Sequence, residues 1–172
     1  MRFRKLGQSD LEVSEIGFGV WTLASDWWGE VEDKAGMLHA ALDSGVNFID
    51  TAPVYGAGAI GETMLRDLLA LQRSEIVLTT KCGYDVNADR IKGQGERPQD
   101  FSPAAVRARL EESLRRLGTD YIDLYQLHNA RIDPIRDDAL WETLLALRAE
   151  GKIREVGVAL GPAIGWVTEG IE

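Results

Sequence analysis

Cysteine is nearly absent from this chain, since Cys82 is the only one among its 172 residues. A single cysteine excludes an internal disulfide and fits a reducing compartment, so we expect a cytoplasmic protein. The sequence also lacks any run of about 18 apolar residues, which argues against a membrane-spanning helix. Its first residues, MRFRKLGQSD, become polar too early to predict a signal peptide. These absences indicate a soluble globular chain.

Basic residues are outnumbered as well. The chain has 19 lysines and arginines against 28 aspartates and glutamates, which gives a net charge of -9. We therefore expect neither nucleic acid nor an anionic membrane as a partner, because both bind clusters of positive charge. Apolar residues make up 45% of the chain, enough for a sizeable core, and its length predicts one domain.

Segments that predict strands alternate with segments that predict helices. A short hairpin is expected first, from residues 2–7 and 11–16. The five strands expected after it are 15–21, 46–50, 75–81, 121–128 and 153–160. The helices expected between them are 32–44, 61–72, 102–118 and 137–151, and a fifth could begin in 162–172. The polar stretch 87–100 predicts a long exposed loop.

This alternation indicates an α/β fold with a parallel sheet, for which two architectures compete. Five strands in 172 residues would complete an open doubly wound sheet. The same pattern would be the first five strands of a (β/α)8 TIM barrel, which normally needs ~250 residues. Length alone favours the open sheet, whereas the motifs favour the barrel.

Three glycines, Gly56, Gly58 and Gly61, match the dinucleotide-binding pattern G-x-G-x-x-G. The match is weak because five residues separate Asp50, at the end of the preceding strand, from Gly56. The next strand ends in Lys81 rather than in the acidic residue that would bind a ribose hydroxyl. We therefore do not interpret these glycines as a dinucleotide fingerprint.

Ionisable residues end three successive predicted strands. Asp50 ends the second strand with Tyr55 in the loop that follows, Lys81 ends the third and His128 ends the fourth. In a barrel the carboxyl ends of several strands supply the catalytic residues together. Any one of these residues could be an ordinary polar residue at a strand end. All four at corresponding heights are more simply explained as one site.

The four residue types suit the protonation of an oxygen on which negative charge develops. The Lys81 ammonium would lower the pKa of the Tyr55 hydroxyl, and Asp50 would hold Lys81 charged and in place. His128 could donate to a carbonyl oxygen and orient it. The sequence offers neither a catalytic nucleophile nor a metal-ligand cluster.

We interpret two further residues with potentially reactive side chains, His39 and Cys82, as structural rather than catalytic. His39 lies in the middle of a predicted helix, far along the chain from His128. Cys82 follows Lys81 directly, so its side chain points to the opposite face of the strand, and we expect it to pack in the core.

Five segments resemble, in order, the aldo-keto reductases, and together they span nearly the whole chain. They are SEIGFGVWTLASDWWG, GVNFIDTAPVYGAG, IVLTTKCG, SLRRLGTDYIDLYQLHNA and LRAEGKIREVGVAL. The most specific parts are D-T-A-x-x-Y-G from Asp50 to Gly56 and R-L-G-T-D-Y-I-D-L-Y-x-x-H from Arg116 to His128. The resemblance implies a (β/α)8 barrel whose N-terminal hairpin closes the bottom, with residues 1–172 as the N-terminal part of that domain.

The resemblance also assigns an activity and a site. It implies hydride transfer from a nicotinamide cofactor, NADPH rather than NADH, to an aldehyde or ketone, with Tyr55 as the general acid. The catalytic tetrad would be Asp50, Tyr55, Lys81 and His128. The residues expected to contact the cofactor are Gly19, Val20, Trp21 and Asp50.

Three tryptophans extend the expected site to the substrate. Trp21, Trp27 and Trp28 lie in the loop after the first strand, and we expect them to bind the substrate together with Tyr55 and His128. Ordinary core packing is the alternative for such residues. Trp27 and Trp28, however, stand in the polar turn SDWWGE, where large apolar side chains suggest a pocket wall suited to an apolar or sugar-like carbonyl compound.

Departures from the family pattern include Ala159 and Leu160, which follow the fifth strand where the family usually has Ser-Asn to hold the nicotinamide amide, and Val20, which replaces a common threonine. Ala159 and Leu160 favour an alternative function, a non-catalytic binding or regulatory subunit. The chain also ends after five strands, so we expect it to be a portion of a longer protein or to close its barrel with a partner chain, and an oligomer is possible.

Overall fold

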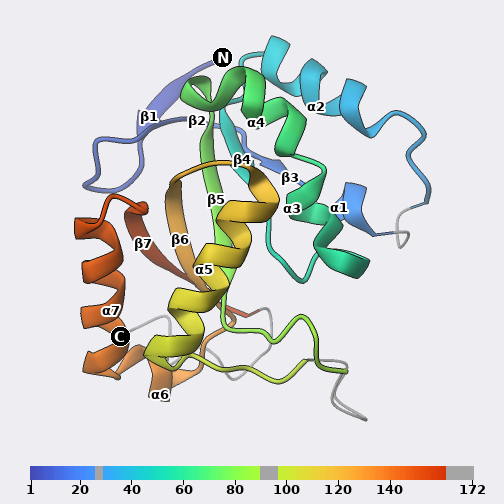
Figure 1. The fold of residues 1–172 in the computed structure, drawn as a ribbon. Coiled ribbons are helices and arrows are strands. Elements are labelled where there is room, and N and C mark those ends of the chain that lie inside the picture. Colours follow the sequence, from blue (N-terminus) through green and yellow to red (C-terminus); the bar gives the residue numbers. More distant parts are fainter. Residues whose placement is uncertain (26–28, 90–96, 162–172) are drawn as a thin grey trace.

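The structure, a computed structural model, describes residues 1–25, 29–89 and 97–161. It contains a five-stranded parallel sheet and a separate two-stranded antiparallel hairpin (Figure 1). The strands are β1 (Phe3–Lys5), β2 (Glu12–Ser14), β3 (Phe18–Gly19), β4 (Phe48–Asp50), β5 (Val77–Cys82), β6 (Ile122–His128) and β7 (Ile153–Ala159). The helices are α1 (Trp21–Ala24), α2 (Lys34–Asp43), α3 (Ile60–Thr63), α4 (Arg66–Gln72), α5 (Pro103–Leu117), α6 (Ile132–Ile135) and α7 (Asp138–Ala149), with 3₁₀ turns η1 (Ala57–Ala59) and η2 (Arg73–Glu75).

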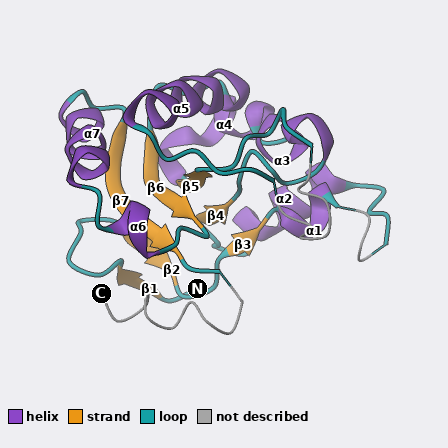
Figure 2. Ribbon diagram, turned by 90° about the horizontal axis from the view of Figure 1, so that it is seen from below, coloured by secondary structure: helices purple, strands orange, loops and turns teal. Residues whose placement is uncertain are grey.

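The strand order decides between the two architectures. The parallel strands lie in the same order as in the sequence, from β3 to β7. The larger helices follow one side of a curved sheet (Figure 2). A doubly wound sheet would instead reverse its strand order and carry helices on both faces. The chain therefore forms the first five strands of a barrel, as the motifs predict.

The two faces of the sheet have different surroundings. On the helix-covered face of β6, Tyr125 and Leu127 are fully buried, together with the inner faces of α5 and α7. On the concave face, Leu124 and Gln126 are only partly buried. The apolar core thus lies between the sheet and its helices, which fixes which residues of each strand face the concave side.

The N-terminal hairpin covers the end of the sheet where the strands begin. Leu11 and Val13 form a second apolar cluster with Val77 at the start of β5. Asn47, just before β4, accepts a hydrogen bond from the Ser14 amide at 2.7 Å through Oδ1. Its Nδ2 donates to the Glu12 carbonyl at 2.9 Å. The hairpin therefore closes the bottom of the sheet, leaving the carboxyl ends of the strands at the opposite end.

Helices α5 and α7 follow the sequence prediction closely. Ser102 caps α5 by accepting from the Ala105 amide, Pro103 stands in its first turn, and Gly118 ends it with φ of 68°. These are the cap residues that fix helix ends in a sequence. The exposed loop expected at 87–100 contains no helix or strand in its described part.

Two other elements differ from their prediction. The helix expected over 61–72 is divided into α3 and α4 at Met64 and Leu65, where the Leu65 amide donates to the Glu62 carbonyl in a tighter turn. The strand expected to run to Trp21 ends at Gly19. Val20 already begins a helical turn, since the Leu23 and Ala24 amides both donate to its carbonyl.

Cys82 and His39 do not contribute to the concave face. Cys82 is buried in the main core, as predicted, and burial raises the pKa of its thiol to about 12. His39 is exposed on α2. Within the described ranges, no helix has the length and apolarity needed to cross a bilayer.

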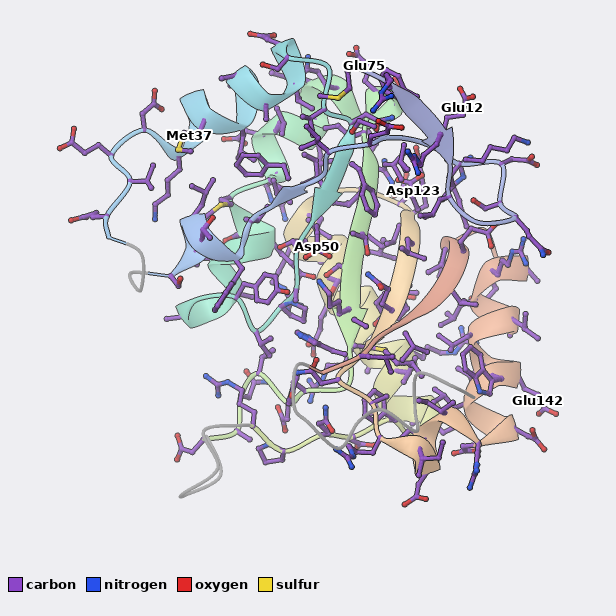
Figure 3. All side chains as sticks on the ribbon, turned by 180° about the vertical axis from the view of Figure 1, so that it is seen from behind. Glu12, Met37, Asp50, Glu75, Asp123 and Glu142 are labelled. Atoms are coloured by element: carbon purple, nitrogen blue, oxygen red, sulfur yellow. The ribbon has the colours of Figure 1, made fainter. Side chains whose placement is uncertain are left out.

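A buried carboxylate joins three strands near the hairpin end of the sheet (Figure 3). Asp123, on β6, is 1% exposed and accepts from the amide of Leu78 on β5 at 2.9 Å. It also pairs with Arg73 at 2.8 Å and with Arg154 of β7 at 2.7 Å. Removing the negative charge would leave two guanidinium groups without this partner.

We predict that Asp123→Asn lowers the free energy of unfolding by about 1.5–3 kcal/mol, the usual contribution of hydrogen bonds to a charged group, because Arg154 stays half exposed and Arg73 keeps its bonds to the Ile76 and Tyr121 carbonyls. Denaturant unfolding of the purified protein measures it. Asp120→Asn, at an exposed position in the same segment, is the matched control and should change stability by less than about 0.5 kcal/mol. Equal effects of the two substitutions would contradict this role of Asp123.

Candidate active site

The strand register places the polar strand residues on one concave face. Asp50 is paired with Thr79, Lys81 with Gln126, and His128 with Ala159. Partners in a parallel register face the same side, so all of these side chains point inward. We expected these residues at corresponding heights along their strands, and the strand register contradicts this. Lys81 lies two residues beyond the residue paired with Asp50, and His128 lies two residues beyond the residue paired with Lys81. Barrel strands are staggered and tilted, which brings such stepped positions to one mouth.

The Lys81 amine is the centre of the site. Its Nζ donates to Asp50 Oδ1 at 2.6 Å, to the Thr51 carbonyl at 2.9 Å and to Tyr55 Oη at 3.2 Å. These bonds use all three donors of an ammonium group. Lys81 is buried, whereas the Asp50 side chain remains 34% exposed. The structure therefore brings Asp50, Tyr55 and Lys81 into direct contact.

The loop between β4 and α3 holds Tyr55 against Lys81. The Gly61 amide donates to the Tyr55 carbonyl at 2.9 Å, and Thr51 Oγ1 donates to the Gly61 carbonyl at 2.7 Å. A side chain at Gly61 would approach Tyr55 Cβ to 2.7 Å, so only glycine allows this contact. Gly61, in the first turn of α3, is thus required for packing against Tyr55 rather than for a phosphate-binding turn.

His128 completes the group from β6. Its ring lies edge-on to the Tyr55 ring, with 5.9 Å between centroids, and edge-on to the Tyr84 ring, with 5.0 Å between centroids. Tyr84 in turn accepts a hydrogen bond from Asn129 Nδ2 at 3.0 Å. All four residues of the expected tetrad therefore meet at the carboxyl ends of the strands.

The protonation of Tyr55 differs from the sequence expectation. We expected the Lys81 ammonium to lower the pKa of Tyr55, but this pKa is raised. Burial of the phenol is the main cause, and the negative charge of Asp50 adds to it. Asp50 lies 2.6 Å from Lys81 and offsets its positive charge, so the lysine does not compensate for the loss of water. Tyr55 is consequently protonated at neutral pH.

The other two titratable groups are also affected by burial. Burial lowers the pKa of Lys81, and the charge and hydrogen bond of Asp50 oppose this change. Burial lowers the pKa of His128 to about 3, and the positive charge of Lys81 acts in the same direction. His128 is therefore a neutral imidazole at neutral pH, a form that can still donate one hydrogen bond.

The residues expected beside a cofactor lie around the end of β3. Gly19 is paired with Asp50, and a side chain added to it would meet no atom within 4 Å, so space is open there. The Val20 side chain is fully buried and its amide donates to the Asp50 carbonyl at 2.8 Å, so any contact with a ligand would involve its backbone. Trp21 is 41% exposed at the start of α1. Trp27 and Trp28 lie outside the described residues.

Sequence reasoning missed several residues that support the site. The Thr51 carbonyl accepts from Lys81, Tyr84 packs on His128, and Glu62 is buried behind the Tyr55 loop. A main-chain carbonyl leaves no trace in a sequence, and Tyr84 looks like any aromatic residue after a strand. Only Glu62, an acid within an apolar helix pattern, offered a signal.

Comparisons with known proteins identify the family. Residues 15–164 match the Aldo/keto reductase family. The chain is 34% identical over 163 residues to the aldo-keto reductase YhdN of Bacillus subtilis and 33% identical over 166 residues to the NADH-specific methylglyoxal reductase of Escherichia coli. Among solved structures, aldo-keto reductase AKR11C1 from Bacillus halodurans in its holo form is 40% identical, with a TM-score of 0.78. The chain therefore belongs to the aldo/keto reductase family.

The chain spans about half the length of these relatives. The alignments cover 92% of the chain and 47% of YhdN, 90% of the chain and 50% of the methylglyoxal reductase, and 93% of the chain and 50% of AKR11C1. The matched residues include all four residues of the expected tetrad.

The lowered pKa of His128 predicts a pH dependence of stability. Between its ordinary value of 6.5 and about 3, the unfolded chain binds a proton at this residue that the folded chain does not. Stability supplied by the neutral imidazole is present above pH 6.5 and is lost as the pH falls from there toward 3. The contribution has a slope of about 1.4 kcal/mol per pH unit.

Urea unfolding across this pH range tests the prediction. His128→Gln should flatten the decline of unfolding free energy at acidic pH, whereas His39→Gln, on the exposed surface of α2, should keep the wild-type decline. Identical pH profiles for wild type and His128→Gln would contradict the assignment of a buried neutral imidazole.

Proposed function

We propose that this chain provides the catalytic tetrad of an NAD(P)H-dependent carbonyl reductase. Hydride would add to the carbonyl carbon of an aldehyde or ketone, the C=O π electrons would move to oxygen, and Tyr55 would supply the proton that completes the alcohol. The observation that carries the proposal is the contact of Tyr55 Oη with Lys81 Nζ at 3.2 Å. Asp50 Oδ1 lies 2.6 Å from the same nitrogen.

The geometry supports Tyr55 as the proton donor. Lys81 donates to the phenol oxygen, so the hydroxyl hydrogen of Tyr55 is directed to another acceptor. When that proton moves to the substrate oxygen, the phenolate that remains lies beside the Lys81 amine, which stabilises negative charge. His128, neutral and next to the Tyr55 ring, can donate to the same substrate oxygen and orient it.

The nicotinamide would be held at the end of β3. When bound, it supplies the hydride that none of these side chains can provide. Gly19 fits this placement because it leaves open space at the level of Asp50, and the exposed Trp21 follows two residues further along the chain. We favour NADPH from the family resemblance, although the similar methylglyoxal reductase is NADH-specific by its name.

The substrate is proposed to be a small carbonyl compound bound between Trp21, Tyr55 and His128, with Trp27 and Trp28 as further wall residues. We also propose that residues 1–172 form the N-terminal part of one barrel domain. Additional chain or a partner chain would then complete the barrel, and we propose a cytoplasmic location from the composition.

One observation favours a second function. Ala159 faces the concave side beside His128, and Leu160 follows it with 42% exposure. Neither side chain can hydrogen-bond the amide of a nicotinamide, so a bound cofactor would lack these anchors. The alternative is therefore a binding or regulatory subunit that retains the tetrad without efficient turnover.

We predict that Tyr55→Phe lowers kcat by about 10²–10⁴-fold, the usual contribution of a positioned acid. The assay follows loss of reduced nicotinamide absorbance with a panel of aldehydes and ketones, using purified protein that contains this chain. Tyr121→Phe is the matched control, because Tyr121 lies away from the tetrad, where its ring contacts Arg73, and a phenyl ring keeps that contact. It should retain wild-type activity.

Two other results would favour different conclusions. Full activity of Tyr55→Phe would exclude Tyr55 as the proton donor. Binding of NADPH by the wild type, measured by fluorescence, without turnover of any carbonyl in the panel would support the regulatory subunit.

A further inference from the structure

A second buried carboxylate lies directly behind the candidate active site. Glu62, on α3, has no exposed surface. Its Oε1 accepts from Thr80 Oγ1 at 2.7 Å, and its Oε2 accepts from Arg116 Nε at 2.6 Å. One carboxylate thus joins three elements, α3, β5 and α5, that are far apart in the sequence.

On one side Glu62 is connected to Tyr55. The preceding residue, Gly61, donates its amide to the Tyr55 carbonyl at 2.9 Å and leaves no room for a side chain against Tyr55 Cβ. Its carbonyl accepts from Thr51. A shift of Glu62 would therefore move the backbone that carries Tyr55.

On the other side Glu62 is connected to Lys81. Thr80 directly precedes Lys81 on β5, and the two side chains point to opposite faces of the strand. Lys81 contacts Tyr55 on the concave face, while Thr80 contacts Glu62 on the helix-covered face. The consecutive residues Thr80 and Lys81 are thus bound, on opposite faces of β5, to the segment that carries Tyr55 and Glu62, which we call the Tyr55 segment.

We propose that Glu62 is a positioning residue for the reaction, which fixes the Tyr55 segment against β5 and so sets the separation of Tyr55 Oη and Lys81 Nζ. The inference rests on the proposed carbonyl reductase function. A buried ion pair is weak evidence for stability, because an apolar side chain of similar size often stabilises as well. An apolar side chain, however, could not accept from Thr80 and Arg116 at once and would leave the two segments free to shift.

Two substitutions test this connection, one at each end of the hydrogen bond between Thr80 and Glu62. Glu62→Gln keeps the size of the side chain but removes the charge that binds Arg116. Thr80→Val keeps the shape of Thr80 but removes the hydroxyl that binds Glu62. Both should lower kcat by about 10- to 100-fold with little change in KM, since displacement of about 1 Å can reduce the rate by that order. Thr80→Ser retains the hydroxyl and should restore kcat.

The division of the effect between kcat and KM separates positioning from a general loss of structure. A shifted proton donor lowers kcat, while substrate binding and therefore KM stay near their wild-type values. Thr80→Ser retains the hydroxyl that binds Glu62, so rescue of kcat by this variant would show that the hydrogen bond is responsible.

Asp123→Asn provides the matched structural control, because it also removes the charge of a buried carboxylate paired with arginine, at the hairpin end of the same sheet. Under conditions where each variant is folded, as judged by circular dichroism, it should keep the wild-type kcat and KM. Wild-type kcat in Glu62→Gln and Thr80→Val, or an equal loss in Asp123→Asn, would overturn the inference. Absence of turnover in the wild type would instead contradict the proposed function.

Discussion

The buried amine of Lys81 is the interaction on which the site depends. An ammonium group taken out of water must find acceptors for its hydrogens, and Lys81 finds three: a carboxylate, a main-chain carbonyl and a phenol. Each acceptor comes from β4 or from the loop that follows it. The cost of burying one lysine therefore determines where that loop must lie, and with it the position of Tyr55.

The rest of the fold makes this arrangement possible. The hairpin closes the opposite end of the sheet through Asn47 and Val77, and the helices bury the outer face of β5 and β6. Two buried carboxylates, Asp123 at the hairpin end and Glu62 near the mouth, hold neighbouring elements in register. The apolar core between the sheet and its helices thus lies apart from the polar groups of the concave face.

Much of this could be predicted from the sequence for physical reasons. Strand ends that carry Asp50, Lys81 and His128 are visible because each follows an apolar run, and the caps at Ser102 and Gly118 mark the ends of α5. The stagger of the three strands could not be predicted, since register depends on how the barrel twists. The raised pKa of Tyr55 was missed for a related reason. Burial and the charge of Asp50 outweigh Lys81 only once the packing is known.

The most direct test is an experimental structure of the protein that contains this chain, at a resolution that defines the Lys81 side chain. The account predicts Lys81 Nζ within hydrogen-bond distance, about 3 Å, of Asp50, the Thr51 carbonyl and Tyr55 Oη at the same time. A Lys81 side chain turned to solvent, or a Tyr55 hydroxyl out of its reach, would contradict the proposed proton-donating site.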